Sequence, residues 1–363
     1  MAVFVALLVI ILFTGARIAS PGKFQTDYLS KDNTAAVKGL FVLLVFLSHG
    51  AQYIQLGGGY DAPYEALKNH LNQMVVAPFW VYSGYGIMES VQKKGFGYVK
   101  SIPTRRFFTV LLSFDLAVLL FWGVGALLGR SYDWQTVLWS LIGWKSVGNS
   151  NWYIFAALVL YLLAFAAFLP LKWWRKKPAP FVSAALMTAL TVAFVYWQMK
   201  MHRPGYCYNT LILFPLGMWL SLLKKPVAAV LMRNDVGYLA GLLVLVGVYA
   251  VAFLRRWQGI EWYTVWAVAF SLILVMITMK ITFGNGILTW FGSHVFSVYI
   301  LQRIPMMILE KLGVSGAHKY LFLILSLAAT MALAEGFDRL VGRITGRLFA
   351  RPKEEKKTEE ARV

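Results

Sequence analysis

The sequence is poor in cysteine and in acidic residues. Its 363 residues include one cysteine, Cys207, and 16 Asp and Glu against 35 Lys and Arg. A single cysteine excludes an internal disulfide, and because nothing resembles a Cys/His metal site we expect no bound metal. The P-loop, HExxH, GxSxG and dinucleotide-binding motifs are also absent. Nucleotidases, zinc proteases and the common serine hydrolases therefore lack support.

Apolar residues make up 59% of the chain and charged residues only 14%, compared with about 25% charged in soluble proteins. Long apolar runs recur along nearly the whole length. They predict an all-α, polytopic integral membrane bundle of about eleven spanning helices. The expected spans are residues 2–16, 39–56, 72–91, 107–128, 152–171, 181–200, 208–223, 236–254, 262–281, 287–309 and 319–337. Residues 134–144 are too few to cross a bilayer, and we expect an interfacial or re-entrant segment there.

The basic residues indicate how these spans are oriented. Of the 35 Lys and Arg, 25 fall in one set of alternate loops and the C-terminal tail, and nine fall in the other set. The positive-inside rule then places the N-terminus outside and the tail in the cytoplasm. The net charge of +19 is explained by this topology, so no nucleic acid partner is expected.

The chain contains no segment long enough to form a separate soluble domain. Residues 1–34 are expected to form an extra N-terminal span and a cytoplasmic linker, because the first apolar run lacks the basic segment and cleavage site of a signal peptide. Ten further spans lie within 35–340, and 341–363 is a charged cytoplasmic tail. No internal repeat is evident.

One apolar segment, KGLFVLLVFLSHG, carries Lys38 and His49. Eleven helical steps place both side chains on nearly the same face, about 16 Å apart along the axis. His49 is then deep in the membrane, where ionisable residues are costly and usually functional. We expect it to act as a general base; a purely structural hydrogen bond to a neighbouring helix is the alternative.

Other basic residues are candidates for binding phosphate. Lys38 at a cytoplasmic mouth suits a phosphate, as do Arg105 and Arg106 at the start of the next span, although all three could simply mark topology. Asp115, deeper in that span, is expected to pair with a basic residue. Arg303 lies within an apolar span and is expected either to line a polar cavity or to form an ion pair.

The outer ends of two spans are polar or aromatic. Asn149, Asn151 and Trp152 precede one apolar run, and Asn209 precedes another. We expect these four residues to face an acceptor substrate, with helix capping and interfacial anchoring as the alternatives. Ser83, within FWVYSGYGIMES, is a further candidate, although small residues there also suit close helix packing.

These segments together resemble the acyltransferase type 3 family of polytopic membrane acyltransferases. Its first core helix carries Arg-x10-His, matched by KGLFVLLVFLSHG, and its second ends in F-x-x-S-G-[FY], matched by WVYSGY. The basic pair, NWYIFAALVLY and SVYIL follow in family order, so the resemblance covers residues 35–340. Two positions depart from the family: Lys38 replaces an arginine, and Gln302 stands where many members have histidine.

The resemblance implies transfer of an acyl group, commonly acetyl from acetyl-CoA, to a hydroxyl of a cell-envelope carbohydrate such as a polysaccharide. It implies no tightly bound cofactor, acyl-CoA as co-substrate, and location in the cytoplasmic (inner) membrane of a bacterium. Lys38, Arg105 and Arg106 would hold the CoA phosphates, His49 would deprotonate the acceptor, and Arg303 or Tyr299 would stabilise the oxyanion. A transient acyl-histidine is a variant of this mechanism.

Two other functions are compatible with intramembrane polar residues. A secondary transporter or flippase would be expected to have repeated halves with broken helices, which this sequence does not display. A catalytically silent scaffold or sensor would tolerate the Lys38 and Gln302 departures, but the retained His49 argues against it. Acceptor, acyl chain length and oligomeric state are not indicated by the sequence.

Overall fold

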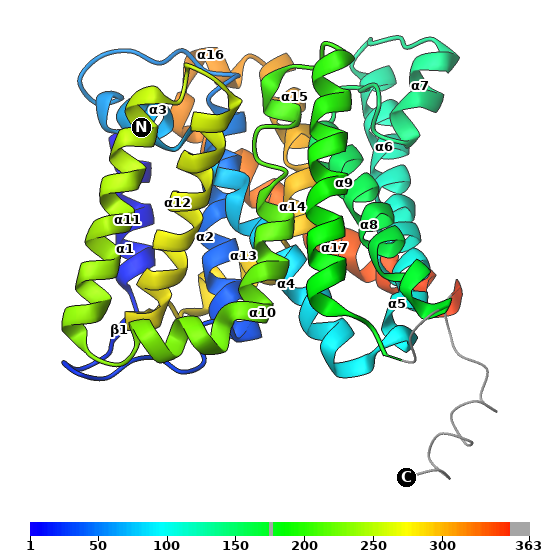
Figure 1. Ribbon diagram of the computed structural model, residues 1–363. Coiled ribbons are helices and arrows are strands. Elements are labelled where there is room, and N and C mark those ends of the chain that lie inside the picture. The colour runs from blue at the N-terminus through cyan, green and yellow to red at the C-terminus, as the bar shows by residue number, and fades with distance from the viewer. Residues whose placement is uncertain (174–176, 349–363) are drawn as a thin grey trace.

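The computed structural model describes residues 1–173 and 177–348, and these form a bundle of helices that run between two opposite ends (Figure 1). α3 lies at the upper end of Figure 1, and β1 and α5 lie at the lower end. The α-helices are α1 (Ala2–Phe13), α2 (Lys31–Gly50), α3 (Ala62–Leu71), α4 (Ala77–Lys94), α5 (Phe96–Ile102), α6 (Thr109–Leu127), α7 (Trp134–Leu141), α8 (Trp152–Phe168), α9 (Pro180–Lys200), α10 (Leu213–Leu231), α11 (Asp235–Arg255), α12 (Ile260–Lys280), α13 (Gly286–Ser293), α14 (Val295–Leu301), α15 (Arg303–Lys311), α16 (Val314–Ala317) and α17 (Lys319–Leu348). Short helical turns η1 (Asn72–Val76), η2 (Pro103–Phe108), η3 (Pro170–Trp173) and η4 (Gly205–Cys207) connect them, and β1 (Arg17–Ile18) pairs antiparallel with β2 (Ile281–Thr282).

The expectation of an all-helical membrane bundle is confirmed. Each expected span overlaps a helix, and among the described residues seven helices are long and apolar enough to cross a bilayer: α2, the continuous run Phe96–Leu127, α9, α10, α11, α12 and α17. α1 and α8 are apolar but shorter. α4 is long enough, but three of its 18 residues are charged, namely Glu89, Lys93 and Lys94. The count of eleven spans therefore stays a prediction.

α2 begins eight residues earlier than expected. The Ser30 hydroxyl accepts a hydrogen bond from the Asn33 backbone N–H, and Asp32 in the first turn suits the positive end of the helix dipole. The helix therefore includes the polar residues before the apolar run. Lys38 consequently lies two turns inside α2 rather than at its end.

The next correction concerns Arg105 and Arg106, which were expected to open a span. They lie instead within η2, a π-helical turn in the middle of the continuous helical run Phe96–Leu127. Turns of this kind widen a helix locally and are frequent at functional sites.

The expected span 287–309 is broken into α13, α14 and α15. Pro305 has no N–H to donate to the carbonyl of Leu301, and its ring crowds that carbonyl, so the helix is interrupted at Gln302. A second interruption falls at His294, where the Ser293 hydroxyl donates to the Trp290 carbonyl and competes with the helical ladder. Tyr299 lies in the short middle piece, α14.

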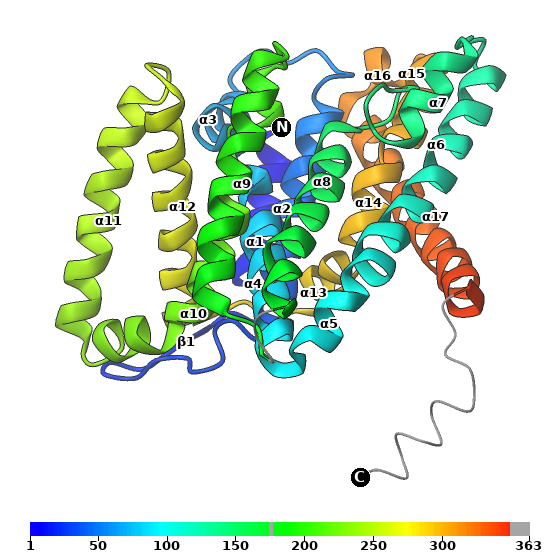
Figure 2. The same ribbon diagram turned by 45° about the vertical axis from the view of Figure 1, so that its right-hand side comes forward.

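Two helix pairs approach so closely that their backbones touch. A Cβ at Gly39 of α2 would lie 1.9 Å from the Leu288 carbonyl oxygen of α13, and one at Gly84 of α4 would lie 1.9 Å from the Phe214 carbonyl oxygen of α10. Only glycine allows these contacts. The small-residue pattern around Gly84 therefore serves helix packing, and it holds α2 and α4 at a fixed distance from their partners. α11 packs on α12 at the edge of the bundle, as Figure 2 shows.

Candidate functional site

Two cavities open from opposite ends of the bundle. The upper cavity has a volume of about 560 Å³ and is lined by Val45, Ser48, His49, Gln52, Lys68, Asn69, Asn72, Gln73, Val75, Val76, Trp152, Tyr206, Arg256, Trp257 and Tyr299. The lower cavity has a volume of about 950 Å³ and is lined by residues of α2, α4, η2, α8 and α14, among them Lys31, Lys38, Ser83, Tyr85, Lys93, Arg106, Tyr153, Tyr161 and Tyr299. Both volumes are in the range of sites for small organic ligands.

Tyr299 and Val76 line both cavities, so the two spaces meet at these side chains. The Tyr299 hydroxyl is buried and makes no hydrogen bond within the described residues. Its ring packs edge-on against Tyr153, with 5.5 Å between ring centroids, and 6.1 Å separates it from the His49 ring. A hydroxyl donor thus stands unused at the junction of the two cavities.

His49 lines the upper cavity beside this junction. Its Nδ1 is enclosed and has no partner among the described residues, which leaves Nε2 as the nitrogen that a ligand in the cavity can reach. An imidazole with no protein hydrogen bond is not being used as a structural link between helices. The geometry suits a base that accepts a proton from a bound hydroxyl.

The lower cavity is basic. Lys31, Lys38, Lys93 and Arg106 line it, and the Arg106 Nε donates to the Tyr98 hydroxyl at 3.1 Å. The acidic lining residue, Glu89, is neutralised by Lys224, with 2.7 Å between Nζ and Oε1. None of these four cations has a carboxylate within 4 Å in the described part of the chain, and together they favour an anionic ligand with several negative charges.

Arg303 does not line either cavity. Its Nε donates to the Ser150 hydroxyl at 2.9 Å, its Nη1 to the Tyr53 hydroxyl at 3.3 Å, and its Nη2 to the Gln52 side-chain carbonyl at 2.7 Å. Because Gln52 lines the upper cavity, Arg303 holds an amide at the cavity wall and leaves the amide N–H groups of Gln52 free.

The expected acceptor residues separate into two groups. Trp152 lines the upper cavity and Ser83 lines the lower one. The Asn149 side-chain oxygen accepts from the Val147 N–H at 3.1 Å, and Asn151 Nδ2 donates to the carbonyls of Gly143 and Lys145, so both asparagines shape the loop before α8.

Three further residues lie away from the two cavities. Asn209 packs against Gly205. Both Arg105 and Arg106 are exposed, but only Arg106 lines the lower cavity. Asp115 was expected to pair with a basic residue, but Oδ1 is buried without a partner and no ion pair to Asp115 occurs among the described residues. The expected ion pair of Asp115 with a basic residue is therefore not found in the described part of the chain.

Several lining residues escaped the sequence analysis. Gln52, Asn72, Arg256 and Trp257 belong to loops or helix ends that are polar and therefore look like ordinary surface. Asn72 offers a signal only in the structure: its φ of +45° is unusual for a residue with a side chain, and such backbone strain gathers at functional sites.

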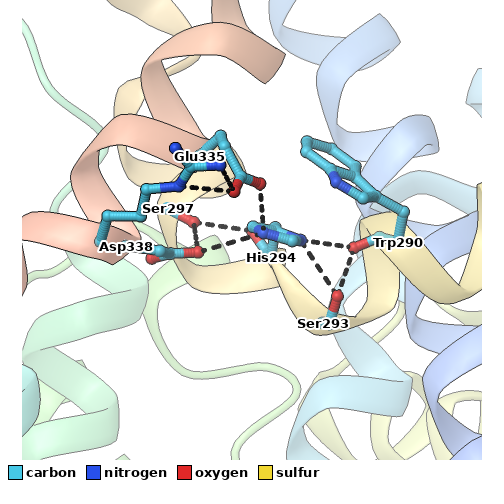
Figure 3. Close-up of polar contacts among 7 residues, drawn as sticks. Trp290, Ser293, His294, Ser297, Glu335 and Asp338 are labelled. Atoms are coloured by element: carbon cyan, nitrogen blue, oxygen red, sulfur yellow. Dashed lines mark hydrogen bonds and ion pairs between the residues drawn. The ribbon is translucent and has the colours of Figure 1, made fainter. Parts of the chain in front are cut away.

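A polar cluster fixes α14 to α17 beside the lower cavity (Figure 3). His294 Nε2 lies 3.2 Å from Glu335 Oε2, while its Nδ1 lies 2.8 Å from the Trp290 carbonyl oxygen. The Ser297 hydroxyl donates to Asp338 at 2.8 Å. The signal for this cluster was available, because Glu335 and His294 are ionisable residues within apolar segments. It anchors the short helix that carries Tyr299.

Comparison with known proteins places the chain in a family. No curated protein and no solved structure gives a significant match. The family model described as an acyltransferase domain matches residues 35–335, which is most of the chain and includes α2 through most of α17. The resemblance expected from the sequence motifs is therefore confirmed. The chain belongs to the acyltransferase 3 family and is a membrane-bound member of it.

Proposed function

We propose that the protein transfers an acyl group, acetyl in the simplest case, from acyl-CoA in the lower cavity to a hydroxyl of a carbohydrate-like acceptor in the upper cavity. The observation that carries this proposal is the meeting of two cavities at Tyr299, next to His49. A transferase with substrates on opposite sides of a membrane needs such a junction.

The donor follows from the charge of the lower cavity. Acyl-CoA carries phosphates at one end of a long arm and the thioester at the other. Lys31, Lys38, Lys93 and Arg106 supply the cations that would hold the phosphates, and the arm would reach toward Tyr299. The positive-inside rule supports a cytoplasmic position for this end, where acyl-CoA is made.

In the proposed reaction His49 Nε2 takes the proton from the acceptor hydroxyl as its oxygen attacks the thioester carbonyl. The Tyr299 hydroxyl donates to the oxyanion of the tetrahedral intermediate. When the intermediate collapses, the carbon–sulfur bond breaks, and the thiolate of CoA receives the proton held by His49. Arg303 acts as a positioning residue through Gln52.

The test compares wild type with His49→Gln, which preserves the size and polarity of the side chain but cannot act as a base. In purified protein supplied with a sugar acceptor, we expect both to bind acetyl-CoA and the variant to release free CoA about 10²–10⁴-fold more slowly than wild type. Full CoA release by His49→Gln would contradict the role of His49. A folded wild type that neither binds nor consumes acetyl-CoA would reject acyl-CoA as the donor and favour transport.

A further inference from the structure

The upper cavity contains positive charge that the protein does not balance. Lys68 and Arg256 line it, and no acidic residue does. Within the part of the chain that the structure describes, neither basic group has a carboxylate within 4 Å. A cavity wall with two uncompensated cations attracts an anion.

Arg256 is held in place mainly by aromatic rings. Its guanidinium lies 3.7 Å from the centroid of the Phe253 ring and 5.1 Å from that of Trp257, and Nη1 donates to the Phe253 carbonyl. The negative end of the α11 helix dipole also stabilises the positive charge of this guanidinium. Nε, however, is buried without a partner, and Nη2 makes no hydrogen bond to the described residues. A guanidinium with an unused Nη2 and no carboxylate partner is suited to receive an oxyanion from the cavity.

The rest of the upper cavity suits a sugar. Trp152, Tyr206 and Trp257 provide aromatic surfaces on which a ring can pack, and Gln52 and Gln73 provide amides that bond hydroxyls. Resting on the proposed function, the acceptor's reactive hydroxyl would lie toward His49 and its charged group toward Arg256.

We infer that the acceptor is an anionic glycan, in which a carboxylate or phosphate near the reactive sugar binds Arg256 and Lys68. These two residues then determine specificity, and a neutral sugar of the same shape binds more weakly. The inference concerns the acceptor alone and requires no particular acyl donor.

The experiment measures binding by the fluorescence of the cavity tryptophans, using the full chain in lipid nanodiscs with no acyl donor present. The probes are methyl β-D-glucoside, methyl β-D-glucuronide and glucose 1-phosphate. We expect wild type to bind at least one charged probe about tenfold more tightly than the neutral one, with a preference that weakens as salt is raised. The carboxylate and phosphate probes distinguish the two kinds of anion.

The variants are Arg256→Gln and Lys68→Gln, with Arg255→Gln as the matched control, because Arg255 packs over Trp262 and does not line the cavity. Arg256→Gln should lose most of the preference while still binding the glucoside, which shows that it is folded. Arg256→Lys should recover part of the preference for charged probes, and Arg255→Gln should keep all of that preference.

Equal or undetectable binding of charged and neutral probes by wild type would overturn the inference, as would an unchanged preference in the Arg256→Gln, Lys68→Gln double variant. Failure of the proposed function gives a different result. In that case the anion preference persists in wild type, but no CoA is released from acetyl-CoA.

Discussion

At the scale of single residues, Tyr299 and His49 carry the chemistry of the account. A buried hydroxyl without a partner costs about 1–3 kcal/mol, so its retention at the junction of two cavities needs an explanation. The proposed donation of a hydrogen bond from this hydroxyl to a transient oxyanion supplies that explanation. His49 was predicted because an ionisable side chain in an apolar helix is conspicuous, whereas the family resemblance implied Tyr299 or Arg303 as the oxyanion donor. The sequence did not predict the hydrogen bond from Arg303 to Gln52, because that contact joins residues 251 positions apart.

The variant Tyr299→Phe removes only the hydroxyl. We expect kcat for acyl transfer to fall by about 10²-fold or more, as for other oxyanion donors, while acetyl-CoA binding stays unchanged. The control is Tyr238→Phe, which removes a buried hydroxyl bonded to the Met276 carbonyl, far from both cavities. A Tyr299→Phe enzyme with the kcat of wild type would exclude the hydroxyl as the oxyanion donor.

At the scale of helices, the position of the site depends on close packing. Glycines bring α2 against α13 and α4 against α10, and Lys38, His49 and Ser83 lie on two of these four helices. The sequence indicated small residues in α4, but which carbonyl each glycine faces depends on the tertiary arrangement. The breaks at His294 and Gln302 were likewise only partly predictable. Pro305 in the sequence indicates that the helix is interrupted, but the residues at which the pieces end depend on local hydrogen bonds.

Substituting Gly84→Ala tests the packing of α4 on α10. The new methyl group would overlap the Phe214 carbonyl, so the helices must separate, and we expect a lower midpoint of thermal unfolding in detergent. The matched control is Gly86→Ala in the same helix, where nothing lies within 4 Å of the added carbon. Equal midpoints for the two variants would show that this contact is not important for stability.

Asp61 connects three segments at the upper end. Its side chain is fully buried and accepts from Lys319 Nζ at 2.7 Å, from the Met1 nitrogen at 2.7 Å and from the Gly57 N–H at 2.8 Å. These donors, led by Lys319, hold the pKa of Asp61 well below its ordinary value of 3.8. Deprotonated Asp61 therefore stabilises the fold above about pH 4, and this contribution is lost as the pH falls further.

The pH dependence of unfolding checks this contact. Between pH 7 and pH 3 we expect the midpoint of thermal unfolding to fall further in wild type than in Asp61→Asn. The variant should have a midpoint a few degrees lower at pH 7, and it has no carboxylate whose stabilising contribution can be lost in acid. Thermal midpoints measured across this range give the comparison. Parallel curves for the two proteins would show that Asp61 contributes nothing to the acid sensitivity.

At the scale of the whole molecule, composition and apolar runs were enough to predict a helical membrane bundle, and the resemblance of several motifs to a known family was enough to predict the family. They were not enough to predict the two cavities. Lys68 of the short helix α3 and the loop residue Trp257 reach the upper cavity from segments almost 200 positions apart, and polar residues there resemble ordinary surface. The sequence therefore indicated the basic residues of the lower cavity and His49, and the structure adds the shape and charge of the upper cavity.

The central claim is that the acyl group passes from one cavity to the other through the junction at Tyr299 and His49. The most direct test uses inside-out membrane vesicles, with [14C]acetyl-CoA added outside and methyl β-D-glucuronide trapped within. The account predicts labelled glucuronide inside the vesicles with wild type and at least 10²-fold less with His49→Gln. Label that forms only when donor and acceptor share one side, or that forms equally with His49→Gln, would contradict it.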